Sequence, residues 1–160
     1  MTSLTEQYLA QKNAAERNIL LRQLVCHPPE DGKDFFLKAY KKERFLDMKL
    51  TAIRGYAAYA SEAEVAQLME KLMEDLKKRP EKTPYDYQEY EPMRSVFLLP
   101  YLIGRYHYEC FHLFSEQLEK QYAAMPDCFK NIYTLDEQGN VRHLRDPHEV
   151  DRAILAFLSR

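Results

Sequence analysis

Glycine is scarce in this sequence, with only four among 160 residues. Such a low content suits helices with little turn chemistry rather than a turn-rich β-protein. Tryptophan is absent, and there is no dense run of lysine or arginine. The formal net charge is −2, and both signs are interspersed among the 30% of residues that are charged. A dedicated nucleic-acid binder usually has a strongly basic domain or patch, so this composition argues against one.

Cysteine is also sparse, and its spacing excludes common cysteine-based sites. Cys26, Cys110 and Cys128 are odd in number and widely separated, without the paired spacing of a zinc site or a redox dithiol. Reduced thiols in a cytoplasm are the simplest interpretation. The stretch 1–11 lacks the basic and apolar regions of a signal peptide. The longest apolar run, 96–103, contains a proline and is too short for a membrane span. We therefore expect a cytoplasmic protein that does not enter a membrane.

The chain is organised around residues 45–76, which read as two consecutive helices. The first helix has apolar residues on two faces, which is typical of a helix buried between neighbours. The second has a single apolar stripe, with charged residues around the rest of its circumference. Ser61 is a good N-cap, and Glu64 three residues later completes a capping box. The predicted stripe consists of Val65, Leu68, Met69, Leu72, Met73 and Leu76.

A degenerate copy of this pattern returns 45 residues later. The shift places Ile53 on Leu98 and Tyr56 on Tyr101, and the order of a buried helix followed by an amphipathic helix repeats. A period of about 40–47 residues built from helix pairs is typical of HEAT and armadillo arrays. The segment DMKLTAIRGYAAYA resembles the second helix of a HEAT repeat, in its order of an acidic residue, a basic residue, small apolar residues and a glycine.

This resemblance covers about half of the chain and implies an all-α fold. The expected architecture is a stack of helical hairpins, that is, a HEAT-like α-solenoid, with repeat-like units at about 45–79 and 90–124. Another all-α bundle is the alternative. By its length the whole chain, 1–160, is expected to form a single domain.

The flanking segments complete the predicted helical domain. A long helix capped by Ser3 or Thr5 is predicted to run to about Val25, where a following His-Pro-Pro sequence stops it. A short helix at about 33–43 then leads through a charged corner into the central stretch. The C-terminal region, 131–160, is expected to cap the array.

Two elements are predicted in this C-terminal region. Residues 131–144 alternate β-branched and aromatic residues around a polar turn, which predicts a small β-hairpin. Asp146 and Pro147 then form a helix start, with Glu149 completing a capping box. The resulting helix is predicted to close the open end of the stack.

The best candidate binding surface is the connection 80–92, in which three prolines bracket alternating tyrosines and acids. Tyrosine offers large contact area and a polar tip, which is why it is enriched at interfaces. The acids would favour a basic protein partner. The alternative is that the tyrosines only pin a long connection onto the helices beneath it. The residues in question are Tyr85, Asp86, Tyr87, Glu89 and Tyr90.

The densest group of reactive side chains lies at 105–112, where Glu109 and His112 have the Glu-x-x-His spacing of di-iron bundle proteins. Those proteins need the motif twice, whereas it occurs once here, so we expect neither a metal nor a cofactor. Cys110 falls on the predicted apolar stripe and is expected to be a buried, inert thiol. Pro100 predicts a kink in the preceding helix near 96–100.

A second candidate surface follows from the HEAT resemblance, which implies that the second helices of the repeats line a concave face. The residues placed there are Arg54, Tyr56, Tyr101 and Arg105. This groove could hold an enzyme site or a nucleic acid, since some HEAT-like proteins are DNA-repair glycosylases. Our first interpretation is instead a non-enzymatic module that binds another protein: an adaptor, an inhibitor or a toxin-neutralising immunity-type protein.

Overall fold

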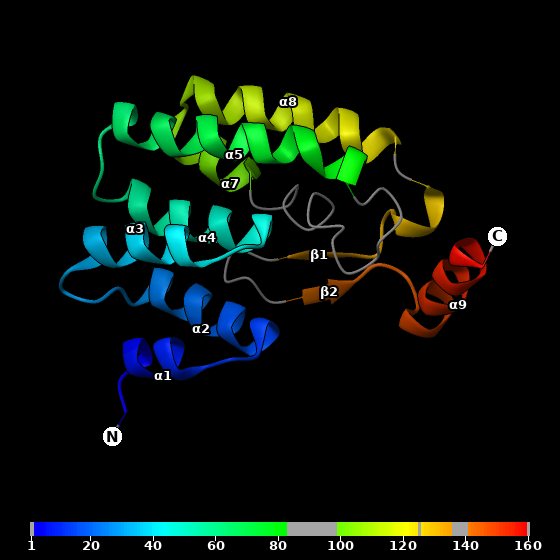
Figure 1. Cartoon of the computed structure of the whole chain (residues 1–160), viewed down its shortest axis with the longest axis horizontal. Coiled ribbons are helices and arrows are strands. Elements are labelled where there is room, and N and C mark those ends of the chain that lie inside the picture. Colours follow the sequence, from blue (N-terminus) through cyan, green and yellow to red (C-terminus); the bar gives the residue numbers. More distant parts are fainter. Residues whose placement is uncertain (1, 83–98, 125, 136–140, 160) are drawn as a thin grey trace. The chain divides into compact units, whose positions relative to one another are not determined.

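The computed structural model describes residues 2–82, 99–124, 126–135 and 141–159. Most residues in these ranges are helical, which confirms the predicted all-α class (Figure 1). The chain divides into two compact units, Met1–Leu68 and Met69–Arg160, and one helix carries the chain from the first into the second. Within the described ranges, no helix combines the length and the apolar character needed to cross a membrane.

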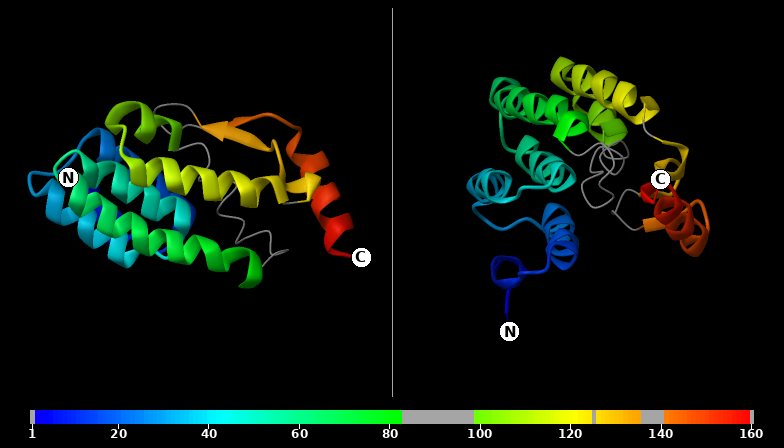
Figure 2. Two further views of the ribbon diagram at one scale, coloured as in Figure 1. Left: turned by 90° about the horizontal axis from the view of Figure 1, so that it is seen from above. Right: turned by 45° about the vertical axis from the view of Figure 1, so that its right-hand side comes forward.

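The first unit consists of α1 (Leu4–Ala10), α2 (Ala14–Cys26), α3 (Gly32–Lys42), α4 (Leu46–Ala57) and the beginning of α5 (Glu62–Lys82). Helix α1 lies beside α2, and α4 lies beside α3, as the right-hand view of Figure 2 shows. Helix α4 also packs against α2. The first unit therefore contains two helix pairs, and the second helix of one pair contacts the second helix of the other.

The predicted single helix from Ser3 or Thr5 to about Val25 is wrong, because two helices occupy that stretch. Gln11 has extended backbone angles, and Asn13 caps α2 by accepting a hydrogen bond from the Glu16 backbone N–H at 3.0 Å. An asparagine side chain competes with the continuing helix for backbone donors, which favours a new N-terminus at this point. At the start of α1, Ser3 forms a capping box with Glu6.

Helix α4 is buried over most of its surface, as its two apolar faces predict. Ile53 is fully buried, and Phe36 of α3 is equally inaccessible. Gly55 makes the close approach of these two helices possible, since a Cβ at this position would lie 2.5 Å from the Phe36 ring. A larger side chain would force the helices apart.

The capping box predicted at the start of α5 is confirmed. Ser61 Oγ accepts from the Glu64 N–H at 3.2 Å, and the Ser61 N–H donates to Glu64 Oε1 at 3.0 Å. Lys33 lies 2.9 Å from the same carboxylate. Hydrogen bonds lower the pKa of Glu64 to about 2; the one from the Ser61 backbone has the largest effect, and the one from Lys33 has the next largest. Five residues of the predicted stripe are buried, namely Val65, Leu68, Met69, Leu72 and Leu76, whereas Met73 is half-buried.

Helix α5 continues through Pro80 to Lys82, so the predicted connection does not begin at residue 80. A proline has no N–H with which to bind the carbonyl four residues earlier. That carbonyl belongs to Leu76, and it accepts a hydrogen bond from Gln121 Nε2 at 2.9 Å. A side chain thus supplies the donor that the proline lacks, which explains how the last turn of α5 tolerates Pro80.

The second unit also contains α7 (Leu99–Tyr106) and α8 (Glu109–Ala124). Helix α8 begins only at Glu109, because His107 has a positive φ of 55° and interrupts the helical backbone after α7. The kink predicted near 96–100 falls largely outside the described residues.

Burial repeats along the sequence, but with a shift of 46 residues rather than the predicted 45. Tyr56 is buried and its predicted counterpart, Tyr101, is 37% exposed, whereas Leu102 is fully buried. A helix turns about 100° per residue, so an error of one residue moves a side chain to another face. The pairs of residues 46 positions apart in which both members are buried are Ile53 and Leu99, Tyr56 and Leu102, Val65 and Phe111, Leu68 and Phe114, and Leu72 and Leu118.

The predicted β-hairpin is confirmed. Strands β1 (Tyr133–Leu135) and β2 (Val141–His143) pair antiparallel, with Thr134 opposite Arg142. The short 3₁₀ helix η2 (Asp127–Phe129) precedes them. Arg145 Nη1 donates to the carbonyls of Lys130 at 3.0 Å and Cys128 at 3.4 Å, and so ties the end of the hairpin to η2.

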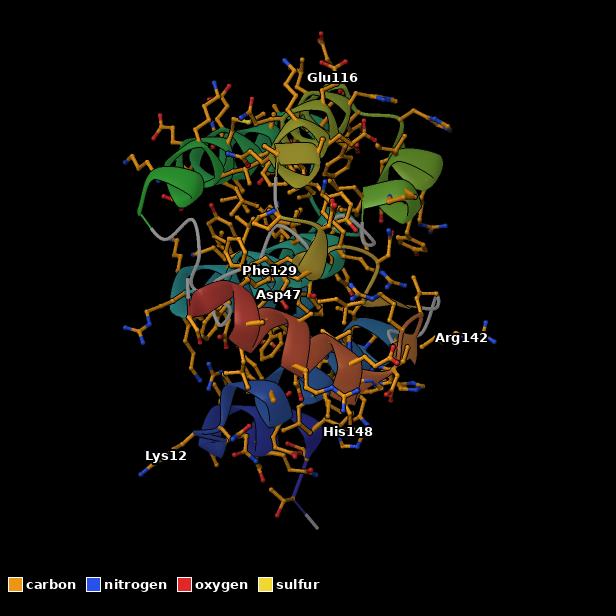
Figure 3. The ribbon with its side chains drawn as sticks, turned by 90° about the vertical axis from the view of Figure 1, so that its right-hand side faces the viewer. Lys12, Asp47, Glu116, Phe129, Arg142 and His148 are labelled. Atoms are coloured by element: carbon orange, nitrogen blue, oxygen red, sulfur yellow. The ribbon has the colours of Figure 1, made fainter. Side chains whose placement is uncertain are left out.

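Helix α9 (Pro147–Leu158) begins at the predicted N-cap, Asp146. The predicted capping box does not form, because the Asp146 side chain makes no capping hydrogen bond. The apolar stripe of α9 packs on a small core around Phe129, which Figure 3 labels. The buried members of this core are Phe129, Ile132, Val150 and Ile154.

Candidate functional site

The tyrosine-acid surface predicted from the sequence lies outside the described residues, so Tyr85, Asp86, Tyr87, Glu89 and Tyr90 stay a prediction. The concave-face residues fall in different units: Arg54 and Tyr56 in the first, Tyr101 and Arg105 in the second. Tyr56 is 4% exposed and its hydroxyl lies 3.4 Å from Glu64 Oε2. Its ring therefore belongs to the core of the first unit rather than to an open surface.

Arg54 is half-buried on a polar face of α4 that the sequence analysis did not recognise. Asp47, about two turns earlier in that helix, is only 5% exposed, and its Oδ2 lies 3.5 Å from Asn18 Nδ2 of α2. The Thr51 hydroxyl donates to the Asp47 carbonyl at 3.0 Å. The spacing of Asp47, Thr51 and Arg54 at four and three residues is the signal that would have revealed this face.

A second polar cluster, also missed, lies where α1, α2 and the end of α3 meet. Glu43 is 1% exposed, and its carboxylate accepts from the Tyr8 hydroxyl at 2.6 Å. Arg17 binds both carboxylate oxygens, with Nε to Oε1 at 2.7 Å and Nη2 to Oε2 at 2.9 Å. We call these three residues the Glu43 cluster.

The electrostatics of the Glu43 cluster favour a neutral tyrosine and a charged arginine. Burial raises the pKa of Tyr8, and the hydrogen bond to Glu43 raises it further. The hydrogen bond to Glu43 also raises the pKa of Arg17. Because a buried carboxylate needs such partners, the cluster serves to hold helices together.

A set of exposed and half-buried aromatic and basic side chains lies where α7 meets α8. We call this set the α7–α8 corner, and it consists of Tyr101, Arg105, Tyr106, His107 and Tyr108. Tyr101 and Arg105 are both exposed and one helical turn apart, so they share a face of α7. The Arg105 guanidinium lies 5.7 Å from the Tyr106 ring centroid, and its hydrogen bond with Tyr106 raises the pKa of Arg105.

The rings of the corner are ordered by a buried phenylalanine. Tyr106 and Tyr108 have centroids 5.5 Å apart, and Tyr108 stacks on Phe111 at 5.5 Å with an interplanar angle of 18°. Phe111 is fully buried in α8. The corner therefore presents half-buried tyrosines whose rings are already fixed by packing.

His107 gives the corner its backbone turn. Its φ of 55° is in the left-handed region, and its N–H donates to the Ile103 carbonyl at 3.0 Å. Many helices end in this way, with a left-handed residue whose N–H donates back to a carbonyl of the last turn. Glycine usually occupies that position. A histidine here is exposed and carries a conformational cost that glycine would avoid.

Replacing His107 by glycine is therefore expected to leave the free energy of unfolding unchanged or raise it by up to about 1 kcal/mol. His107→Ala, which keeps the unfavourable φ, is the control and is expected to stay close to the wild type. Urea unfolding of the full chain measures both. A loss of more than about 1 kcal/mol in His107→Gly would show that the imidazole makes a stabilising contact.

Nothing in the described residues forms a metal centre, since no three histidine, cysteine or carboxylate side chains gather there. Glu109 and His112 are both exposed at the start of α8. Cys110 is half-buried, so its thiol is less enclosed than the sequence pattern predicts. The expectation that the protein binds no metal or cofactor stays a prediction.

Comparison of the chain with protein-family models, curated proteins and solved structures found no significant match.

Proposed function

We propose that the protein is a cytoplasmic, non-enzymatic module that binds another protein, and that the α7–α8 corner contributes to its binding surface. The observation that carries this proposal is the exposure of Tyr101 beside Arg105 on one face of α7. Tyrosine and arginine are the residue types that most often dominate binding energy at protein interfaces, together with tryptophan.

The fixed packing of the neighbouring aromatic rings supports the same proposal. Tyr108 stacks on buried Phe111, so the corner needs little rearrangement to present its surface. A surface that is ordered before binding loses less conformational entropy when a partner docks. The exposed Leu113, at 50% exposure on the following helix, adds apolar area on the α8 side.

We further propose that the helix pairs stack as in a HEAT-like array. The support is the contact of α2 with α4, together with burial that recurs at a shift of 46 residues in the second unit. The tyrosine-acid stretch with Tyr85, Asp86, Tyr87, Glu89 and Tyr90 is proposed as a further contact that favours a basic partner.

The test begins with a protein that co-purifies with the chain from its native source, whose affinity is then measured with purified components. The double variant Tyr101→Ser, Arg105→Ala is expected to weaken binding by at least about tenfold, because truncated hot spots often cost about 2 kcal/mol each. Leu155→Ser is the matched control, because Leu155 is a 64% exposed apolar residue on α9, away from the corner in sequence. Circular dichroism establishes that each variant is folded.

Wild-type affinity in the folded double variant would overturn the role of the corner. If the Leu155 control weakened binding as strongly, the loss would not be specific to this surface.

A further inference from the structure

We propose that α1 is a latch: a short helix that opens from the first unit on its own, while α2, α3 and α4 stay folded. Helix α1 has only seven residues. A helix of that length is not stable in isolation, even when it is well capped. Its order must therefore come from the few side chains that dock it.

Docking depends on Tyr8. Among the side chains of α1, which are all described, Tyr8 is the buried one, at 1% exposure. Its ring meets the Phe35 ring edge-on with centroids 5.6 Å apart, and Lys42 Nζ lies 4.7 Å from its centroid. Its hydroxyl donates to Glu43. The adjacent Leu9 is 59% exposed and cannot replace these contacts.

The Glu43 cluster allows Tyr8 to leave without stranding a charge. Arg17 belongs to α2 and binds both oxygens of the Glu43 carboxylate. When α1 opens, the carboxylate loses the neutral hydroxyl and keeps its cationic partner. The large penalty for an unpaired buried charge is therefore avoided.

The chain also has a hinge at the right place. Asn13 caps α2 through the Glu16 N–H, so the start of α2 does not depend on α1. Arg17 Nη1 donates to the Lys12 carbonyl at 3.2 Å and to the Gln11 carbonyl at 3.5 Å. These bonds hold the carbonyls of Gln11 and Lys12 on α2, so α1 would swing about the backbone on the N-terminal side of Gln11, an extended residue that directly follows the helix.

Packing of α1 against α2 is incomplete away from Tyr8. An open depression of about 590 Å³ is lined by Thr2, Gln7, Ala10, Gln11 and Leu20. Side chains on this side therefore add little to the docking of α1. Opening of the latch would uncover the Phe35 ring, which is 7% exposed in the closed state.

Hydrogen exchange of the full chain, followed by mass spectrometry, tests the latch. Tyr8→Ala is expected to speed exchange in 4–12 by about 100-fold or more, because truncating a buried aromatic residue removes most of the docking. Exchange in α2, α3 and α4 is expected to change by less than about threefold. Tyr8→Phe, which keeps the ring and removes the hydroxyl, should give a smaller increase confined to the same residues.

Leu9→Ala is the matched control, one position along the same helix, and is expected to leave all rates unchanged. Trypsin gives a second readout, because the Lys12 side chain extends away from the helices (Figure 3). Cleavage after Lys12 should accelerate in Tyr8→Ala, while cleavage at the other sites keeps its wild-type rate.

Two results would overturn the proposal. In one, Tyr8→Ala speeds exchange equally throughout α1 to α4, so that the first unit opens as a whole. In the other, α1 keeps its wild-type protection and resists trypsin.

Discussion

Replacing Glu43 by alanine is expected to lower the free energy of unfolding by about 3–5 kcal/mol. The substitution leaves the Arg17 guanidinium, whose side chain is only 15% exposed, without its carboxylate. It also leaves the buried Tyr8 hydroxyl without its acceptor. An ion pair that loses one buried partner typically costs more than the intact pair contributes, because the remaining charge stays desolvated.

Glu30→Ala is the matched control, because Glu30 is exposed in the connection between α2 and α3. It is expected to change stability by no more than about 0.5 kcal/mol. Urea denaturation followed by circular dichroism gives both values. If Glu43→Ala were as mild as its control, the carboxylate would not be buried in solution.

The Glu43 and Tyr8 substitutions should differ in where they act. Loss of Tyr8 releases α1 alone, whereas loss of Glu43 also removes the link between α2 and the end of α3 that Arg17 makes. Global stability should therefore fall further in Glu43→Ala than in Tyr8→Phe. Comparison of the two variants therefore distinguishes loss of α1 docking from loss of the link between α2 and the end of α3.

Ile53→Ala is expected to cost about 2–5 kcal/mol of unfolding free energy. Ile53 is fully buried on α4, which packs against both α2 and α3, so the missing methyl and methylene groups leave a cavity that rigid neighbours cannot close. Ile19→Ala is the control with the same change of side chain, at a position that is 43% exposed. It should stay within about 0.5 kcal/mol of the wild type.

Thermal and urea unfolding of the two isoleucine variants give this comparison directly. Equal losses in both variants would mean that burial does not distinguish the two positions. A shift of 46 residues places Ile53 on Leu99, which is 1% exposed. The predicted counterpart, Leu98, lies outside the described residues.

Local signals in the sequence were sufficient for much of the secondary structure. Ser61 and Glu64 predicted the start of α5 because both partners of a capping box lie within one turn. Residues 131–144 predicted the hairpin, since the alternating patterns of both strands lie within this one short stretch of sequence. The burial of α4 followed from apolar residues on two of its faces.

Predictions from the sequence were wrong where two local preferences competed. Asn13 divides the predicted N-terminal helix, because its side chain offers the backbone a cap in place of a continuing helix. Periodicity alone did not distinguish a shift of 45 residues, which places Tyr56 on exposed Tyr101, from a shift of 46, which places it on buried Leu102. Only the burial of the folded chain makes that distinction.

By itself, the sequence determined that this protein is helical, where most helices begin, and that a hairpin precedes the last helix. Tertiary structure decided which charged residues are buried and which tyrosines are exposed. Glu43 lies in a charged stretch of the sequence, where exposure would be expected. Its burial depends on Tyr8 and Arg17, which are 35 and 26 residues away in the chain. Tyr56 is buried and Tyr101 is exposed, although the two side chains are identical and both lie on predicted helices. The reason is physical: caps and periodicity involve residues within a few positions, whereas desolvation depends on every segment that packs around a side chain.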